Sequence, residues 1–173
     1  MIRLILALIL VFLTPYVSAG DECADFQALA DNAELGDSVA QANLGEAYFF
    51  GMCVEADTDE AMYWYFRAAE AGSDKAVYAI GLAFSSGIGL DKNERLARHY
   101  FLRAANNGHE AATVNLANVS IDEQYGKCDG IDEIEEMVEK VTSPGIRVLF
   151  DQPRFDQLKA FCSEHGEKIR SIE

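Results

Sequence analysis

The sequence predicts an all-α fold, a solenoid of stacked helix pairs that ends in a C-terminal capping segment. Glycines at positions 36, 72 and 108 are equally spaced, and the two stretches between them carry nearly the same pattern of small and apolar residues. Within each stretch these residues recur at the spacing of a helix face rather than alternating, which predicts two helices. An internal repeat of this length is typical of a solenoid, in which each unit packs on its neighbours.

Residues 1–19 are expected to be a secretory signal peptide. They contain one basic residue, Arg3, an unbroken apolar run at 4–13 and small residues at 17–19. The alternative, a membrane anchor, needs about 20 apolar residues, which is more than this run supplies. We therefore expect a mature chain that begins near Gly20, is not inserted in a membrane and is periplasmic or secreted.

Residues 20–141 are expected to form one repeat domain, and residues 142–173 a cap or tail. The domain divides into a half-unit, two repeats and a degenerate repeat, at 23–36, 37–72, 73–108 and 109–141. The half-unit places Phe26 and Leu29 as the second helix of a repeat does. The degenerate repeat begins in register at Ala112 and Leu116 but then loses the glycine and the tyrosine of the other units.

Glycines and polar residues mark the expected ends of the helices. Gly51 and Gly87 predict the end of the first helix of each repeat, because glycine readily adopts the left-handed conformation that ends a helix. Asp57 and Asn93 precede the second helix and suit N-cap positions. Glu60, three residues after Asp57, predicts a pair like a capping box.

The repeats read ANLGEAYFFG with AMYWYFRAAEAG, then AIGLAFSSGIG with ARHYFLRAANNG. Gly45 and Gly81 lie inside the first helices, where glycine costs about 1 kcal/mol relative to alanine, so they predict close approach of a neighbouring helix. These residues resemble the Sel1-like repeat family, with its pattern A-x-x-x-L-G-x-x-Y-x-x-G-x-G-V-x-x-D-x-x-x-A-x-x-W-Y-x-x-A-A-x-x-G; Cys53 replaces the second loop glycine. The resemblance covers roughly residues 23–141 and implies a TPR-like helical solenoid that binds other proteins.

Four cysteines in an exported chain predict two disulfides, for which three pairings are possible. The solenoid layout places Cys23 and Cys53 on one edge of the stack. It places Cys128 in the loop of the third unit, within reach of a C-terminal helix that carries Cys162. We favour the pairs Cys23 with Cys53 and Cys128 with Cys162 over the other two arrangements.

The formal net charge of -15 argues against partners that are nucleic acids or anionic membrane surfaces. It favours a basic protein partner, unless acidic residues such as those at 133, 135, 136 and 139 are simply a solvated helix face.

No motif for catalysis, a metal or a cofactor is found. His99, His109 and His165 have no ligand spacing with one another or with the cysteines. His99 is expected on an exposed helix face, and His109 close to the C-terminus of the helix that ends repeat two. We expect a protein that is not an enzyme and that holds no metal or cofactor.

A partner-binding groove is expected where the two repeats differ beside their common packing stripe. If the first helix of each unit lines a concave face, nine residues point into this groove: Ala42, Glu46, Phe49, Phe50, Tyr78, Leu82, Ser85, Val114 and Asn118. The apolar ones would form a strip on an otherwise acidic surface, as interaction sites do. The alternative is that the tail folds back and covers the strip.

The tail carries apolar residues that lie outside the repeat pattern. A turn is expected at 143–145, an extended run at 146–150 and a last helix from Pro153. In that helix Phe155, Leu158 and Phe161 share one face, so the tail is either a cap or the feature that selects the partner.

The resemblance narrows the function. Exported Sel1-like proteins act as adaptors in envelope signalling and surface assembly, and several small ones look like immunity proteins against secreted lipase-type effectors. An acidic, disulfide-containing exported chain fits an immunity or inhibitor protein, with a periplasmic regulatory or assembly adaptor as the alternative and a penicillin-binding or hydrolase-type enzyme as a minor one. The expected partner is a secreted effector or an envelope sensor or assembly protein, and the oligomeric state is left open.

Overall fold

The computed structural model describes residues 23, 25–124, 128 and 130–170, and within them the regular structure is entirely helical. The expected signal peptide at 1–19 lies outside these residues. No helix in the described part of the chain is both long enough and apolar enough to cross a membrane.

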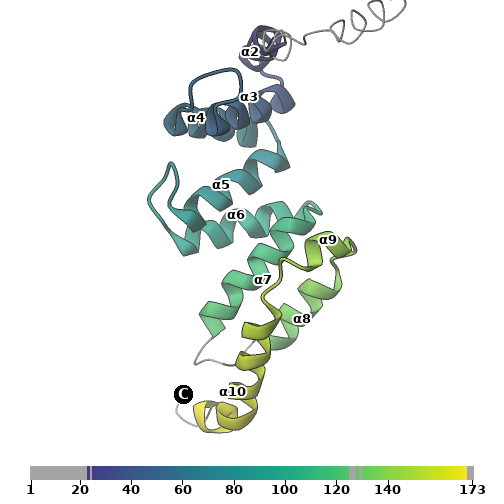
Figure 1. Cartoon of the computed structure of the whole chain (residues 1–173). Coiled ribbons are helices and arrows are strands. Elements are labelled where there is room, and N and C mark those ends of the chain that lie inside the picture. The colour runs from purple at the N-terminus through teal and green to yellow at the C-terminus, as the bar shows by residue number, and fades with distance from the viewer. Residues whose placement is uncertain (1–22, 24, 125–127, 129, 171–173) are drawn as a thin grey trace, which may run out of the picture.

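The helices α2 to α7 follow one another along a stack in chain order, and α8, α9 and α10 pack against α7 at the C-terminal end of the stack (Figure 1). Their bounds are α2 Phe26–Glu34, α3 Ser38–Phe50, α4 Thr58–Glu70, α5 Asp74–Ser86, α6 Glu94–Asn106, α7 Glu110–Gln124, α8 Ile131–Glu139, α9 Pro144–Arg147 and α10 Gln152–Arg170. Helices α3 with α4, and α5 with α6, are the pairs of the two repeats. The predicted all-α solenoid is confirmed.

Short polar side chains begin the repeat helices, as the sequence predicts. Asp57 accepts hydrogen bonds from the backbone N–H groups of Asp59 and Glu60 at 3.0 Å, and Asn93 caps α6 in the same way. These bonds satisfy N–H groups that have no partner inside the helix. The Glu60 side chain does not complete a capping box, because its Oε1 accepts a hydrogen bond from Trp64 Nε1 at 3.0 Å.

The two glycines inside the first helices allow aromatic rings to approach the backbone. A Cβ added to Gly45 would lie 2.9 Å from Cδ1 of Tyr65, and one added to Gly81 would lie 2.7 Å from Cδ1 of Phe101. Both rings come from the second helix of the same repeat. The predicted close approach is confirmed. It explains why each repeat has a glycine at this position despite the low helix propensity of glycine.

The core runs from neighbour to neighbour along the stack rather than around one centre. A small N-terminal cluster joins α2, α3 and α4 around Leu44 and Trp64. A central cluster joins the two repeats around Tyr65, Ile80 and Phe101. A third cluster joins α7 and α8 to the tail.

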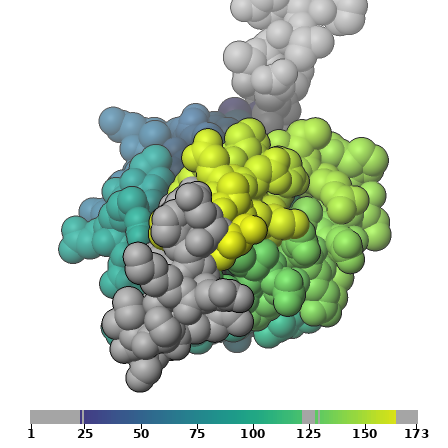
Figure 2. Space-filling model, turned by 90° about the horizontal axis from the view of Figure 1, so that it is seen from below, coloured from purple at the N-terminus to yellow at the C-terminus, as the bar shows by residue number. Residues whose placement is uncertain are grey.

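The tail closes the C-terminal end of the stack. Phe155 and Leu158 of α10 are buried in the third cluster with Ile121 of α7 and Ile134 of α8. Seen from that end, α10 lies across the molecule (Figure 2). The expected extended run at 146–150 is wrong, because Pro144 occupies the first turn of the short helix α9 and its fixed φ suits that position.

The side chain of Glu110 in α7 holds the start of the tail. Glu110 accepts hydrogen bonds from the backbone N–H groups of Thr142 and Ser143 at 2.9 and 3.2 Å. This contact repeats, one unit later, the bond between Asp74 and Asn107. The start of the tail is thus held against the start of α7 as the start of α7 is held against the start of α5.

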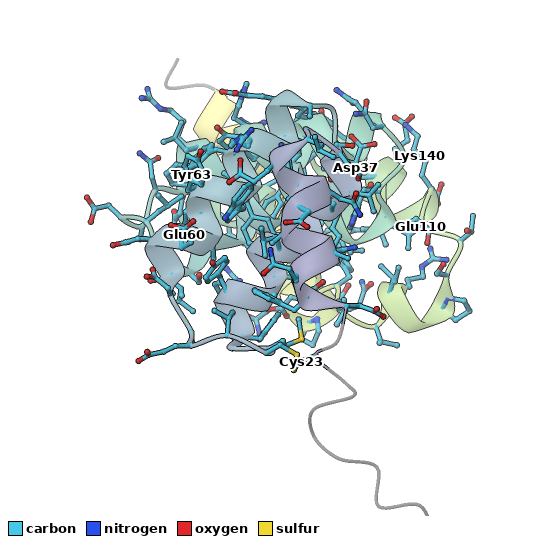
Figure 3. All side chains as sticks on the ribbon, turned by 90° about the horizontal axis from the view of Figure 1, so that it is seen from above. Cys23, Asp37, Glu60, Tyr63, Glu110 and Lys140 are labelled. Carbon is cyan, nitrogen blue, oxygen red and sulfur yellow. A yellow bond between two sulfur atoms is a disulfide. The ribbon has the colours of Figure 1, made fainter. Side chains whose placement is uncertain are left out.

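The two disulfides join Cys23 to Cys53 and Cys128 to Cys162, with Cα atoms 5.4 Å apart in each pair. This is the arrangement favoured from the solenoid layout. Cys23 lies at the edge of the stack beside α2 (Figure 3). Each bond therefore fastens one end of the array to its neighbouring unit, while the two full repeats between them are held by packing.

Candidate functional site

A groove lies between α3 and α5, the first helices of the two repeats, and encloses about 340 Å³. Five of the nine residues predicted for a partner-binding groove line it: Glu46, Phe49, Phe50, Tyr78 and Leu82. Met62, Tyr65, Lys75, Ala79, Ala83, Ser86 and His109 complete its lining. We refer to this space as the repeat groove.

The repeat groove is apolar at the end where α3 and α5 finish. Phe50 is 65% exposed and Leu82 is 41% exposed, which is unusual for side chains of this size. Phe49 and Phe50 stack edge to face with ring centroids 5.0 Å apart. Phe50 and Leu82 lie beside the packing stripe of α3 and α5 rather than in it, so the core does not cover them, whereas Phe49 packs partly against the central cluster.

The other end of the repeat groove is polar. Lys75 at the start of α5 pairs with the carboxylate of Glu46 and donates a hydrogen bond to Asn43 Oδ1 at 2.9 Å. Burial, with a smaller contribution from the Glu46 carboxylate, raises the pKa of Tyr65 to about 12. The Tyr65 phenol therefore remains neutral, and the charges at this end are those of Glu46 and Lys75.

His109 closes one wall of the repeat groove. Its ring stacks on Tyr78 with centroids 4.3 Å apart, and its Nδ1 accepts a hydrogen bond from the backbone N–H of Ala112 at 3.2 Å. The Tyr78 hydroxyl accepts a hydrogen bond from Asn115 at 3.0 Å. His109 lies close after the C-terminus of α6, as expected, and its backbone N–H donates to the Ala104 carbonyl at 3.1 Å. It also begins α7, as Asp37 begins α3, which was not predicted from the sequence.

Four residues predicted for the groove lie elsewhere. Ala42 and Val114 are 1% and 0% exposed, because Ala42 belongs to the central core and Val114 packs under the tail. Ser85 is half-buried and does not line the repeat groove. Asn118 binds the tail, donating from Nδ2 to the Leu149 carbonyl and accepting from the Asp151 N–H, each at 3.0 Å.

The part of the tail that the structure describes contacts the stack at the third unit. Its helices contact α7, and its apolar residues fill the C-terminal cluster. Within the described residues, none from the tail lines the repeat groove. The alternative in which the tail covers the whole apolar strip is wrong for the two repeats.

A second hollow of about 390 Å³ lies on the other side of α3, toward α2. Its lining comprises Asp25, Phe26, Leu29, Asn43, Glu46, Ala47, Met52 and Cys53. Glu46 also lines the repeat groove, and Asn43 accepts a hydrogen bond from Lys75 of that groove. The two hollows therefore adjoin along α3. We refer to this space as the N-terminal hollow.

The described side chains offer no metal site. No group of three histidine, cysteine, aspartate or glutamate residues among them is arranged to hold an ion. His99 is exposed on α6 against Tyr100, and the side chain of His165 lies outside the part that the structure describes. Glu60 and Tyr63 of α4 lie on the opposite side of the stack from Glu110 (Figure 3).

The model of the Sel1 repeat family matches residues 38–73 and 74–109. The ERAD-associated E3 ubiquitin-protein ligase component HRD3B of Arabidopsis thaliana is 39% identical over 101 residues, 57% of this chain and 16% of that protein. The chitin synthase regulator SKT5 of Saccharomyces cerevisiae is 38% identical over 83 residues, 47% of this chain and 12% of that protein. The chain thus spans only a small part of these relatives.

Two solved structures share the architecture. A protective antigen of uropathogenic Escherichia coli strains, which displays an SLR fold, superposes with a TM-score of 0.60 and 32% identity, covering 66% of this chain and 24% of the antigen. A Sel1 repeat protein from Oxalobacter formigenes superposes with a TM-score of 0.57 and 28% identity, covering 79% of this chain and 98% of that one.

Proposed function

Because the chain carries two Sel1 repeats and has the fold of Sel1-repeat proteins, we propose that it is an exported, non-catalytic module that binds another protein in its repeat groove. Sel1-repeat proteins mediate protein–protein interactions. The observation that supports this use of the groove is its exposed apolar end, where Phe50 and Leu82 lie uncovered. Apolar side chains that stay exposed beside polar ones are typical of interaction sites.

Two roles fit such a module. A regulatory or assembly adaptor is supported by two relatives, which are a ligase component and a synthase regulator. An inhibitor of a secreted toxin, such as a lipase-type effector, is supported by the net charge of -15, because an acidic surface speeds association with a basic partner. We favour the adaptor role, since only that role has support from the relatives.

The two disulfides support a location outside the cytosol. Such bonds persist in oxidising compartments, and their four cysteines leave no free thiol in the described chain. Together with the leader-like residues 1–19, they support the proposal of a periplasmic or secreted location.

Affinity capture from the native cell envelope tests the proposal. The tagged chain from Gly20 onward should retain a stoichiometric protein partner, and Phe50→Ser with Leu82→Ser should reduce the amount at least tenfold, as expected for hot-spot side chains. Leu102→Ser is the matched control, because Leu102 is an exposed leucine of α6 outside both hollows. Equal capture by the double variant and the control would contradict binding in the repeat groove.

The identity of the captured protein separates the two roles. A sensor or an assembly component supports the adaptor, whereas a secreted toxic enzyme whose activity falls on binding supports the inhibitor.

A further inference from the structure

We propose that the segment held in the repeat groove is basic, with two apolar side chains that fill the two hollows and an arginine or lysine between them that binds Glu46. This inference rests on the proposed protein-binding function and specifies the chemistry of the partner. It follows from three features: the adjoining hollows, the charge of the units around them and the weak ion pair at their border.

Apolar side chains line both hollows, and the two hollows share one carboxylate, that of Glu46. Phe49 and Leu82 line the repeat groove, whereas Phe26 and Leu29 line the N-terminal hollow. Glu46 lines both. A chain that crosses α3 with an apolar side chain in each hollow therefore places the residue between them against Glu46.

The surroundings of the two hollows are strongly acidic. Between residues 23 and 72 the sequence has ten acidic residues and one basic residue, Arg67. Arg67 is already paired with Glu34 at 3.4 Å and lies over the Trp64 ring. Long-range attraction therefore favours a basic segment over an acidic one.

Lys75 occupies the position that the partner's cation would take. It is the one lysine or arginine among the described residues that line the hollows, and its side chain is 48% exposed while that of Glu46 is 35% exposed. A pair this accessible contributes about 0–1 kcal/mol, so a competing cation displaces it at little cost. An arginine would gain more than Lys75 does, because its planar guanidinium binds a carboxylate through two parallel hydrogen bonds.

This arrangement makes opposite predictions for the two partners of the ion pair. Loss of the Glu46 charge removes the acceptor and weakens binding of a basic segment. Loss of the Lys75 charge removes the competitor and strengthens it. If the groove instead held an acidic segment through Lys75, both changes would act in the reverse direction.

The test uses fluorescent peptides with the motif Phe-Ser-Arg-Ser-Phe, flanked by glycines. Alternate side chains of an extended chain point to one face, so this motif presents both rings and the cation together. The matched probes replace Arg by Glu, or both Phe by Ser. Binding is measured by fluorescence anisotropy with the full mature protein and with Glu46→Gln, Lys75→Gln and Glu34→Gln.

The arginine probe should bind at least tenfold more tightly than either matched probe. Glu46→Gln should weaken it about tenfold, as expected for a lost charged hydrogen bond, and Lys75→Gln should strengthen it severalfold. Glu34→Gln is the control for net charge, because Glu34 lines neither hollow, and it should change binding less than twofold. Circular dichroism checks that the variants remain folded.

Three results would overturn the inference: no binding of the arginine probe at about 1 mM, equal binding of the glutamate probe, or weaker binding in Lys75→Gln. The envelope capture separates this failure from failure of the proposed function. If Phe50→Ser with Leu82→Ser abolishes capture while the peptide result is negative, the groove binds protein but the basic segment is wrong. If capture is also unchanged, both proposals fall.

Discussion

Replacement of Gly81 by alanine tests whether the close contact between the two helices of a repeat excludes a side chain at this position. The new Cβ would lie 2.7 Å from both Cδ1 and Cε1 of Phe101. Carbon atoms in favourable contact are about 3.5–4.0 Å apart, so the ring or the helix must move by nearly 1 Å. Phe101 is 1% exposed, so its ring is enclosed by neighbouring groups.

Two opposing contributions determine how much the free energy of unfolding changes. Overpacking of this kind costs about 1–3 kcal/mol, and the better helix propensity of alanine returns about 1 kcal/mol. We therefore expect Gly81→Ala to lower the free energy of unfolding by up to about 2 kcal/mol. With a typical urea dependence, this lowers the unfolding midpoint by up to roughly 1 M.

The assay is urea unfolding of the variant beside Gly145→Ala. Gly145 is also helical, but no heavy atom lies within 4 Å of its added Cβ, so this control should be neutral or stabilised by up to about 1 kcal/mol. Phe101→Leu should remove most of the difference that Gly81→Ala causes. The reasoning is refuted if Gly81→Ala stabilises the protein as much as Gly145→Ala does.

Three further predictions concern the tail. Hydrogen bonds from the Ser143 and Thr142 hydroxyls, and from the Thr142 N–H, lower the pKa of Glu110 from 4.5 to about 2. Because this pKa is lower in the folded state, the carboxylate stabilises the protein above about pH 4.5, and the contribution is lost as the pH falls toward about 2. Glu110→Gln should therefore lower the urea midpoint at neutral pH, and its difference from the unmodified protein should disappear in acid; a constant difference would contradict this. Cys162→Ser opens a loop of 34 residues, and should cost about 3–4 kcal/mol in thermal unfolding, whereas a cost below 1 kcal/mol would show that the tail is held by packing alone. Asn118→Ala leaves the Leu149 carbonyl and the Asp151 N–H without this partner and should speed proteolysis in the tail, as seen by mass spectrometry, with cleavage in the repeats unchanged; equal cleavage rates in the tail would argue against its role as a clamp.

The repeat helices could be predicted because their signals are local. Glycines, caps and apolar spacing recur in register, so the ends of α3 to α6 follow from the sequence. The groove positions Phe50 and Leu82 followed from comparing the repeats beside their shared stripe. His109 could have been found in the same way, because it stands one unit after the N-cap Ser73.

The remaining positions depend on contacts between distant segments. Val114 was expected in the groove because it continues the strip of the first two units, but the tail buries it. Tertiary packing decides whether a segment outside the repeat pattern folds onto the stack, and this packing cannot be inferred from the spacing of apolar residues. Lys75 likewise became part of the site only through its pairing with Glu46 in the preceding unit.

The closed C-terminal face also bears on self-association. A helical stack whose two end faces were both open could add further copies head to tail and grow into filaments. Here Phe155 and Leu158 of α10 occupy the face of α7 and α8 that a following unit would cover. Within the described residues, α10 therefore covers the α7 and α8 surface on which a further copy would have to stack.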